Sequence, residues 1–279
     1  MEFTGERYIP GQGGAIELEH LNRYYFVVNQ LDLTGKTVLD IASGEGYGSS
    51  ILAKYSARVL GVDISSEAIE HAKEKYQAIN LSFIQGSVID IPLEDKSVDV
   101  VVSFETIEHL MEHDVMLIEL KRVLKKGGAL VISSPDKLYY SELPKTKNEF
   151  HIKELYLNEF KDLINKYFKK TIFYSQKIFI GSIIFLDNGT HDYQTSTFLS
   201  SNSVQGRSNP IYNVAIGTDD LDFKPFNQVV MFEKHMELYT TADLQNAIET
   251  GMQKIRSTKA YKIGKYILRP FSKIKKSIK

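Results

Sequence analysis

The sequence predicts an α/β protein with a doubly wound, mainly parallel sheet, and three features of the chain support this fold class. An apolar run that ends in Asp40 opens into glycines at positions 44, 46 and 48. A second apolar run ends in Asp63 and is followed by Ser-Ser-Glu, a helix start. Apolar strand-like runs then alternate with segments of helical periodicity, the pattern of a parallel sheet covered by helices.

The expected elements follow in a regular order after an N-terminal leader over 1–36. Helical apolar spacing over 17–30 places a helix in the leader, directly before the first strand. The 126–128 segment, Lys-Gly-Gly, is a helix stop, because glycine can take the left-handed conformation that ends a helix. Strands are expected at 37–41, 58–63, 81–85, 98–104 and 128–134, and helices at 47–56, 66–78 and 114–125.

The later part of the chain reads as an insertion and an extension. Residues 187–209 are rich in Ser, Thr, Asn and Gly and form a long connection, so they are either a lid over a substrate or a plain loop. We assign 37–220 to the sheet domain and 221–279 to a helical C-terminal extension.

Composition favours a globular enzyme. Of 279 residues, 43% are apolar and 25% charged, enough for one sizeable core and a smaller appendage. There is no cysteine, which excludes disulfides, zinc-thiolate sites and a cysteine nucleophile. The polar start has no signal-peptide run and no apolar stretch approaches the ~20 residues of a bilayer span, so a cytoplasmic protein is expected.

The near-zero net charge hides a basic tail at 252–279. This tail holds ten Lys or Arg and no acid, with aliphatic and aromatic residues interleaved. Such a pattern is typical of a helix at a lipid headgroup layer, here the inner membrane face, although a solvated tail or one docked on the acidic body explains it as well. The acidic remainder of the chain disfavours nucleic acid as a partner.

The glycine segment after the first strand predicts a nucleoside-cofactor loop. Its Gly-x-Gly-x-Gly spacing differs from the Gly-x-Gly-x-x-Gly of dinucleotide sites, and no Gly-Lys-Ser/Thr follows as in a P-loop. Asp63, at the end of the second strand, can bind ribose hydroxyls. Asp40 and Glu45 beside the loop suit a cofactor without phosphates, such as the cationic S-adenosylmethionine.

With both strands counted, the 37–134 segment resembles the class I S-adenosylmethionine-dependent methyltransferases, which have a Rossmann-like fold. The resemblance implies a seven-stranded sheet, completed by a late helix at 154–167 and an antiparallel strand pair at 170–185 and 210–217. It also implies cofactor contacts from residues of the glycine loop, the ribose acid and the adenine and methionine pockets: Asp40, Ala42, Gly44, Gly46, Asp63, Ile64, Gly86, Ser87, Val88 and Phe104.

A second constellation follows the fourth strand. Glu105, Glu108 and His109 fall at i, i+3 and i+4, so on a helical turn they would share one face near the transferring methyl group. His151 follows the fifth strand and could complete the cluster. His109 is the first candidate for the base that takes the acceptor proton, and His151 is the second.

Two carboxylates and two imidazoles form a plausible set of ligands for a divalent cation such as Mg²⁺ or Mn²⁺, with Glu105, Glu108, His109 and His151 as candidate ligands. The arrangement resembles the Glu-x-x-Glu-His plus distal His of small-RNA 2′-O-methyltransferases and the related segment of ubiquinone-biosynthesis O-methyltransferases. Many methyltransferases with Glu-His at this position bind no metal, however, and there the acid or imidazole serves structure.

Six segments together resemble bacterial methyltransferases associated with O-antigen or capsule synthesis: 4–10, 17–24, 42–48, 103–109, 133–137 and 150–156. The resemblance implies O-methylation of a sugar hydroxyl on a polysaccharide or its precursor, with a glycosyltransferase as a potential partner. Two alternatives remain open: a small-molecule enzyme that methylates a catechol or quinone-like hydroxyl, and a non-catalytic cofactor-binding partner of a glycosyltransferase.

Overall fold

The computed structural model describes residue 10 and residues 15–179, 181–187, 192–193, 204–205, 210–220 and 228–231. The chain divides into two compact units, Met1–Phe232 and Glu233–Lys279, and every described residue belongs to the first. The predicted basic tail and most of the 187–209 insertion lie outside the described residues. So does the predicted helical extension over 221–279, except for residues 228–231, which form a strand and not a helix.

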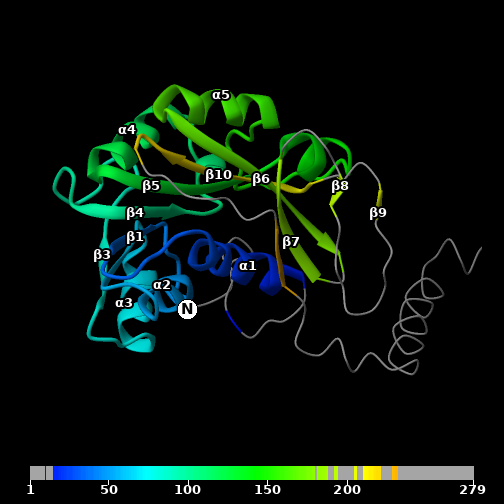
Figure 1. Cartoon of the computed structure of the whole chain (residues 1–279). Coiled ribbons are helices and arrows are strands. Elements are labelled where there is room, and N and C mark those ends of the chain that lie inside the picture. The colour runs from blue at the N-terminus through cyan, green and yellow to red at the C-terminus, as the bar shows by residue number, and fades with distance from the viewer. Residues whose placement is uncertain are drawn as a thin grey trace, which may run out of the picture. The chain divides into compact units, whose positions relative to one another are not determined.

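One twisted sheet organises the described part of the chain, with strand order β11-β7-β6-β10-β5-β4-β1-β2-β3 (Figure 1). The five strands from β1 to β5 pair with one another in parallel. Every pair that involves β6, β7, β10 or β11 is antiparallel. The parallel strands are β1 (Thr37–Ile41), β2 (Arg58–Asp63), β3 (Leu81–Gln85), β4 (Val98–Ser103) and β5 (Leu124–Pro135). The antiparallel ones are β6 (Lys170–Phe179), β7 (Gly181–Leu186), β10 (Tyr212–Thr218) and β11 (Gln228–Met231).

The mainly parallel class is confirmed, but two details of the predicted sheet are wrong. The single strand expected over 170–185 is a tight antiparallel pair, in which Phe179 stands opposite Gly181. The sheet therefore extends beyond the seven expected strands through β7 and β11. Within the insertion, β8 (Asp192–Tyr193) and β9 (Val204–Gln205) pair with each other in a separate two-stranded sheet.

Helices cover both faces of the sheet. Figure 1 shows α4 (His113–Val123) and α5 (Leu157–Tyr167) on one face, and α1 (Ala15–Gln30), α2 (Tyr47–Ala53) and α3 (Ser66–Lys75) on the other. Two short turns, η1 (Ile107–His109) and η2 (Leu138–Glu142), follow β4 and β5. The doubly wound arrangement explains why β1 and β4 are apolar almost throughout, since a parallel strand between two helix layers is buried on both sides.

The connection from α4 to β5 is shorter than predicted. The strand begins at Leu124, directly after the helix, and its pairing with β4 shifts between Val98 and Val100. Gly127 has φ +75°, and a Cβ at Gly128 would come within 2.8 Å of the Asp99 carbonyl oxygen. The two glycines therefore lie at an irregularity within β5, and they do not form the helix stop that we predicted.

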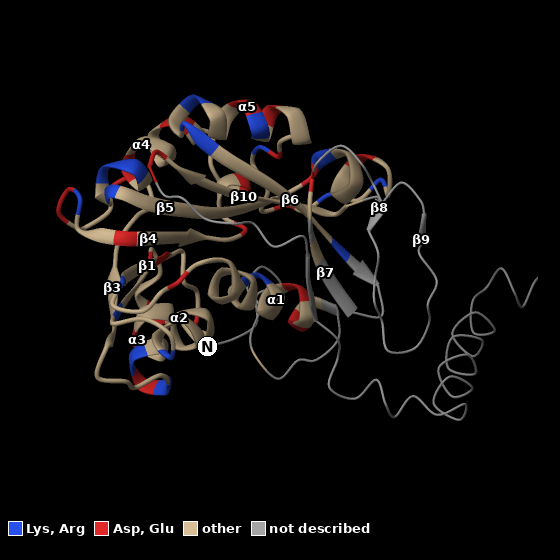
Figure 2. Ribbon diagram, in the orientation of Figure 1, with Lys and Arg blue, Asp and Glu red and all other residues tan. Residues whose placement is uncertain are grey.

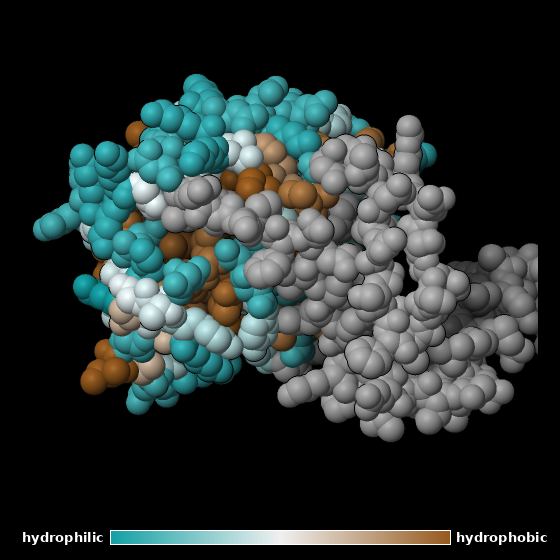
Figure 3. Space-filling view, in the orientation of Figure 1, coloured by the Kyte–Doolittle hydropathy of each residue, from teal (hydrophilic) through white to brown (hydrophobic). Residues whose placement is uncertain are grey.

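The charged side chains lie mainly on helices and loops, and the strands are largely free of them (Figure 2). In the space-filling view, hydrophilic side chains cover the outer helices and frame a recessed hydrophobic area near the middle of the face (Figure 3). Among the described helices, none combines the length and the apolar character that spanning a bilayer would require.

Candidate functional site

A pocket of about 280 Å³ lies at the carboxyl ends of β1 to β4. Open α/β sheets bind their ligands at this edge. Six of the ten predicted cofactor residues line the pocket: Ala42, Asp63, Ile64, Gly86, Ser87 and Val88. Ile64 is 68% exposed, so its apolar side chain is available to pack on a ligand such as an adenine ring.

The glycine loop passes beside the pocket in a conformation that needs its glycines. Gly44 and Gly46 have φ of +55° and +95°, where residues with a Cβ are strained. A Cβ at Gly44 would meet no atom within 4 Å, so the backbone there is open to a ligand. A Cβ at Gly46 would instead meet Phe83 at 2.8 Å. Gly44 thus leaves the backbone accessible to a ligand, and Gly46 allows close packing against Phe83.

Asp63 holds this loop as well as facing the pocket. Its carboxylate accepts hydrogen bonds from the backbone N–H groups of Gly44 and Ser65, both at 2.9 Å. Ser65 in turn caps α3 by accepting from the N–H of Ala68. The acid predicted to bind ribose is therefore kept in place by the loop and by the start of α3.

Asp40 lies behind the loop and is buried. Its oxygens accept hydrogen bonds from Ser49 Oγ at 2.6 Å and from Tyr24 Oη at 3.2 Å. Burial raises the pKa of Asp40 to about 7, against an ordinary value of 3.8. Tyr24 comes from α1, and its ring occupies the space that a Cβ at Gly48 would fill. The leader helix thus packs on the glycine loop through one tyrosine.

Glu45 and Phe104, which we expected to lie beside the cofactor, contact other parts of the protein. Glu45 is buried and faces α3, where it contacts His71, Lys75 and Tyr76 at 3.2, 3.1 and 2.8 Å. Phe104 packs against the Tyr24 ring, edge to face, with 5.2 Å between ring centroids. Neither residue lines the pocket, and Glu45 instead fastens the loop to α3.

The turn after β4 does not have the predicted helical geometry. Glu105 precedes η1 and has φ +48°, a left-handed conformation, so it does not share a helical face with Glu108 and His109. Its carboxylate accepts a hydrogen bond from Ser133 Oγ at 2.5 Å and lies 3.6 Å from Arg23 Nη2. Glu105 lines the pocket, as do Thr106, His109 and Leu110 from the same turn.

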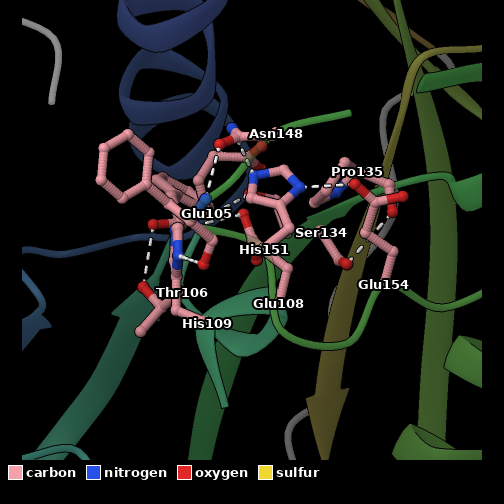
Figure 4. A network of polar contacts seen from close by, with 12 residues as sticks. Glu105, Thr106, Glu108, His109, Ser134, Pro135, Asn148, His151 and Glu154 are labelled. Carbon is pink, nitrogen blue, oxygen red and sulfur yellow. Dashed lines mark hydrogen bonds and ion pairs between the residues drawn. The ribbon is translucent and has the colours of Figure 1, made fainter. Parts of the chain in front are cut away.

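Glu108, His109 and His151 come together, as Figure 4 shows. One oxygen or nitrogen from each lies within 4.8 Å of those of the other two, close enough to hold one metal ion. The segment that carries His151 reaches η1 because the N–H groups of Ile152 and Lys153 both donate to the Glu108 carbonyl oxygen. The predicted ligand Glu105 is outside this group.

Each of the two imidazoles is held by a hydrogen bond at Nδ1. Nδ1 of His109 lies 2.9 Å from the Phe150 carbonyl oxygen, and Nδ1 of His151 lies 2.5 Å from a Glu154 oxygen. A carbonyl oxygen can only accept, so Nδ1 of His109 carries the proton and its lone pair is on Nε2. The same tautomer of His151 accepts at Nε2 from Asn148, 2.9 Å away.

Glu108 is the buried member of the group. Burial, and then the negative charge of Glu105, raise the pKa of Glu108 well above its usual range. Its Oε2 has no hydrogen-bond partner among the described residues. A buried carboxyl group with an oxygen that lacks a hydrogen-bond partner is suited to binding a cation, because the cation would stabilise its charged form.

Around His151 the structure adds three residues that no sequence motif indicated. Glu154 and Asn148 orient His151, and Tyr140 stacks on its ring with 5.2 Å between centroids. Glu154 follows His151 by three residues, a spacing that could have indicated the contact. The buried Arg23 also joins distant segments, since it donates to Gln176 at 2.8 Å and stacks on the Tyr212 ring. No local pattern indicates that arrangement.

Methyltransferases are among the known proteins that are similar to this chain in sequence and in fold. Residues 39–132 match the methyltransferase domain family. A probable S-adenosylmethionine-dependent methyltransferase of Mycolicibacterium smegmatis is 35% identical over 167 residues, which make up 59% of this chain and 63% of the relative. The match thus spans less than two thirds of that relative. A fatty-acid O-methyltransferase of the same species is 35% identical over 119 residues, 40% of this chain and 43% of the relative.

A solved structure supports the fold independently. An S-adenosylmethionine-dependent methyltransferase from Thermotoga maritima superposes with a TM-score of 0.53 at 20% identity, over 73% of this chain and 91% of that one. At this identity the likeness shows the fold alone. Together with the sheet order and the glycine loop, it shows the fold of the S-adenosylmethionine-dependent methyltransferases, and residues 39–132 match the methyltransferase domain family.

Proposed function

We propose that the protein transfers the methyl group of S-adenosylmethionine to a hydroxyl oxygen of an acceptor bound beside Glu108, His109 and His151. The main support for the proposal is that His109 both lines the pocket and belongs to the group of Glu108, His109 and His151. An acceptor held at the group would lie next to the methyl donor, as in-line transfer requires.

The two histidines can serve the proton transfer. As the acceptor oxygen attacks the methyl carbon, the carbon–sulfur bond breaks, its electron pair stays on sulfur, and the acceptor proton must leave. A lone pair on Nε2 of His109 can take that proton, and Nε2 of His151 can do so once its contact with Asn148 is broken. The partners at Nδ1, the Phe150 carbonyl and Glu154, would stabilise the imidazolium.

The same residues suit a divalent cation. Two imidazole nitrogens and one carboxylate oxygen favour a borderline ion such as Mn²⁺ over Mg²⁺, which prefers oxygen ligands. Carbonyl and carboxylate partners at Nδ1 of metal-bound histidines are a common supporting arrangement. A bound cation would supply a Lewis acid for the acceptor hydroxyl. Glu108, His109 and His151 would hold it, and Glu105 enters only if its carboxylate turns away from Ser133.

For the acceptor, we propose a sugar hydroxyl of a cell-surface polysaccharide or its precursor, which a glycosyltransferase would supply. Support comes from the sequence segments that resemble glycan-associated methyltransferases, and from the suitability of a metal-binding group for adjacent hydroxyls. A lipid acceptor is the second candidate, because one relative is named as a fatty-acid O-methyltransferase.

The test is transfer of radiolabelled methyl from S-adenosylmethionine to sugar nucleotides, lipid-linked glycans, fatty acids and catechols, each with EDTA and with added Mn²⁺ or Mg²⁺. Label in a glycan that EDTA abolishes and Mn²⁺ restores supports both the acceptor and the metal. Label only in a fatty acid or a catechol assigns the acceptor to that class instead. Tight cofactor binding without transfer to any acceptor favours a non-catalytic partner of a glycosyltransferase.

A further inference from the structure

The order of the strands sets the order of the groups along the pocket. The lining residues follow β3 (Gly86, Ser87, Val88), β2 (Asp63, Ile64), β1 (Ala42) and β4 (Glu105), and these strands are adjacent in that order. If adenine lies at the β3 end and ribose at Asp63, the sulfonium on the ribose 5′-carbon must lie farther along, toward Ala42 and Glu105. Among the residues that line the pocket at this β1–β4 end, Glu105 carries the carboxylate.

Several contacts hold that carboxylate in place. The backbone N–H of Glu105 donates to Ser133 Oγ at 3.2 Å, and the Ser133 hydroxyl donates to Oε1 of Glu105 at 2.5 Å. Arg23 approaches the same oxygen at 3.6 Å, beyond hydrogen-bond distance. The left-handed backbone conformation at φ +48° costs energy for a residue other than glycine. A strained residue with dedicated partners at a ligand pocket suggests a function.

Methyl transfer changes the charge that this carboxylate faces. The methyl donor carries a sulfonium cation, whereas the product, S-adenosylhomocysteine, has a neutral thioether. The ammonium and carboxylate groups of the two molecules are the same. A carboxylate beside the sulfur therefore attracts the donor and contributes much less to binding the product.

We propose that Glu105 recognises the positive charge of the sulfonium and makes the protein bind the methyl donor more tightly than the demethylated product. This inference rests on the proposed function, because it assumes that S-adenosylmethionine occupies the pocket. Ser133 acts as a positioning residue, since its hydroxyl holds the carboxylate. The device limits product inhibition, because the binding contribution of Glu105 is lost when the sulfonium becomes a thioether.

The test is calorimetric measurement of dissociation constants for S-adenosylmethionine, S-adenosylhomocysteine and sinefungin, in which a charged amine replaces the methylsulfonium group. The variant Glu105→Gln keeps the size of the side chain and its ability to accept from Ser133. We expect roughly tenfold weaker binding of the two cationic ligands, equivalent to about 1.4 kcal/mol, and less than about threefold change for S-adenosylhomocysteine.

Two further variants keep the result interpretable. Glu112→Gln removes the same charge from an exposed side chain three residues after His109 that does not line the pocket, and should leave the ratio of the constants unchanged. Ser133→Ala keeps the carboxylate but removes the hydrogen bond that orients it, and should lower the preference for the donor partially. Thermal denaturation of each variant checks that it is folded.

The outcomes separate this inference from the proposed function. An equal loss of affinity for all three ligands in Glu105→Gln, or an unchanged donor-to-product ratio in a folded variant, overturns the role of Glu105. Loss of Mn²⁺ binding with that ratio unchanged would assign Glu105 to the metal group instead. Failure of the unmodified protein to bind any of the three ligands would contradict the proposed function itself.

Discussion

At the scale of single residues, Asp40 joins the cofactor loop to the leader helix, and its environment makes stability depend on pH. In the folded chain its pKa is about 7, and in the unfolded chain it returns to about 3.8. Between these values the folded state keeps the proton that the unfolded state releases. Ionisation of Asp40 therefore lowers stability progressively as pH rises from about 4 to about 7, with no further change above that range.

The variant Asp40→Asn tests this, because it is neutral at every pH. We expect the free energy of unfolding of the unmodified protein to fall relative to that of the variant by up to about 4 kcal/mol between pH 4 and 7, the equivalent of three pKa units. Urea denaturation of the cofactor-free proteins at a series of pH values measures the difference. A difference that stays constant across this range contradicts the buried-acid explanation.

The two histidines of the site make a second prediction at this scale. Replacing His109 or His151 by Ala should lower turnover on the order of 10²-fold if that side chain takes the acceptor proton. Glu154→Gln should have a smaller effect, because it removes the charge behind His151 while leaving the ring in place. Initial rates with saturating cofactor provide the measurement, and near-normal rates for both histidine variants would rule out the assignment.

At the scale of elements, side chains of α3 and β3 pack closely against the turn between β1 and α2. Gly46→Ala would combine a strained φ of +95° with contacts of 2.8 Å to Phe83 and 2.9 Å to Ala72. We expect it to destabilise the protein by roughly 2–4 kcal/mol and to weaken cofactor binding, since strain and overpacking each cost on the order of 1–3 kcal/mol.

Gly35→Ala is the matched control for this variant. Gly35 has φ +73°, but a Cβ there would meet no atom within 4 Å. Its cost should be limited to the backbone strain, about 1 kcal/mol, with cofactor affinity unchanged. Denaturant melts and cofactor titrations of the two variants compare them directly, and equal costs would show that packing at Gly46 is unimportant.

The attachment of the cofactor loop to α3 makes another element-scale prediction. Glu45 is fully buried and bound by three side chains of α3 and the residue that follows it. Glu45→Ala should cost on the order of 2 kcal/mol, because partners such as Tyr76 lose a hydrogen-bond acceptor, although the half-exposed Lys75 can rehydrate. Glu74→Ala, at an exposed position of the same helix, should change stability by less than about 0.5 kcal/mol.

At the scale of the whole molecule, charge is unevenly distributed along the chain. The 252–279 segment carries ten basic residues and no acid, and the remaining chain is acidic. Because that segment lies outside the described residues, association with the inner membrane face stays a prediction. The full chain should float with vesicles that contain anionic lipid, in a salt-sensitive manner, and a chain ending at residue 251 should not. Flotation of both chains, or of neither, would contradict a role for the basic tail.

Much of the fold is predictable from the sequence, because it depends on local patterns. The bounds of β1, β2 and β3 agree with the strands expected at 37–41, 58–63 and 81–85. Apolar runs between turn residues define such strands without reference to distant contacts. The extra strands β7 and β11 were not predictable, since an edge strand depends on where the chain turns back and which edge is open.

The class of fold, the glycine loop and the acid at Asp63 could be predicted from the amino-acid sequence, because each follows directly from a strand end and its neighbours in the chain. The rest of the site depends on tertiary contacts. Glu45 and Glu105 stand beside motif residues, yet one is turned to α3 and the other is held by Ser133 and Arg23. His151 reaches Glu108 through backbone hydrogen bonds that link segments more than 40 residues apart. Such contacts depend on how the loops close over the sheet, which no local sequence pattern specifies.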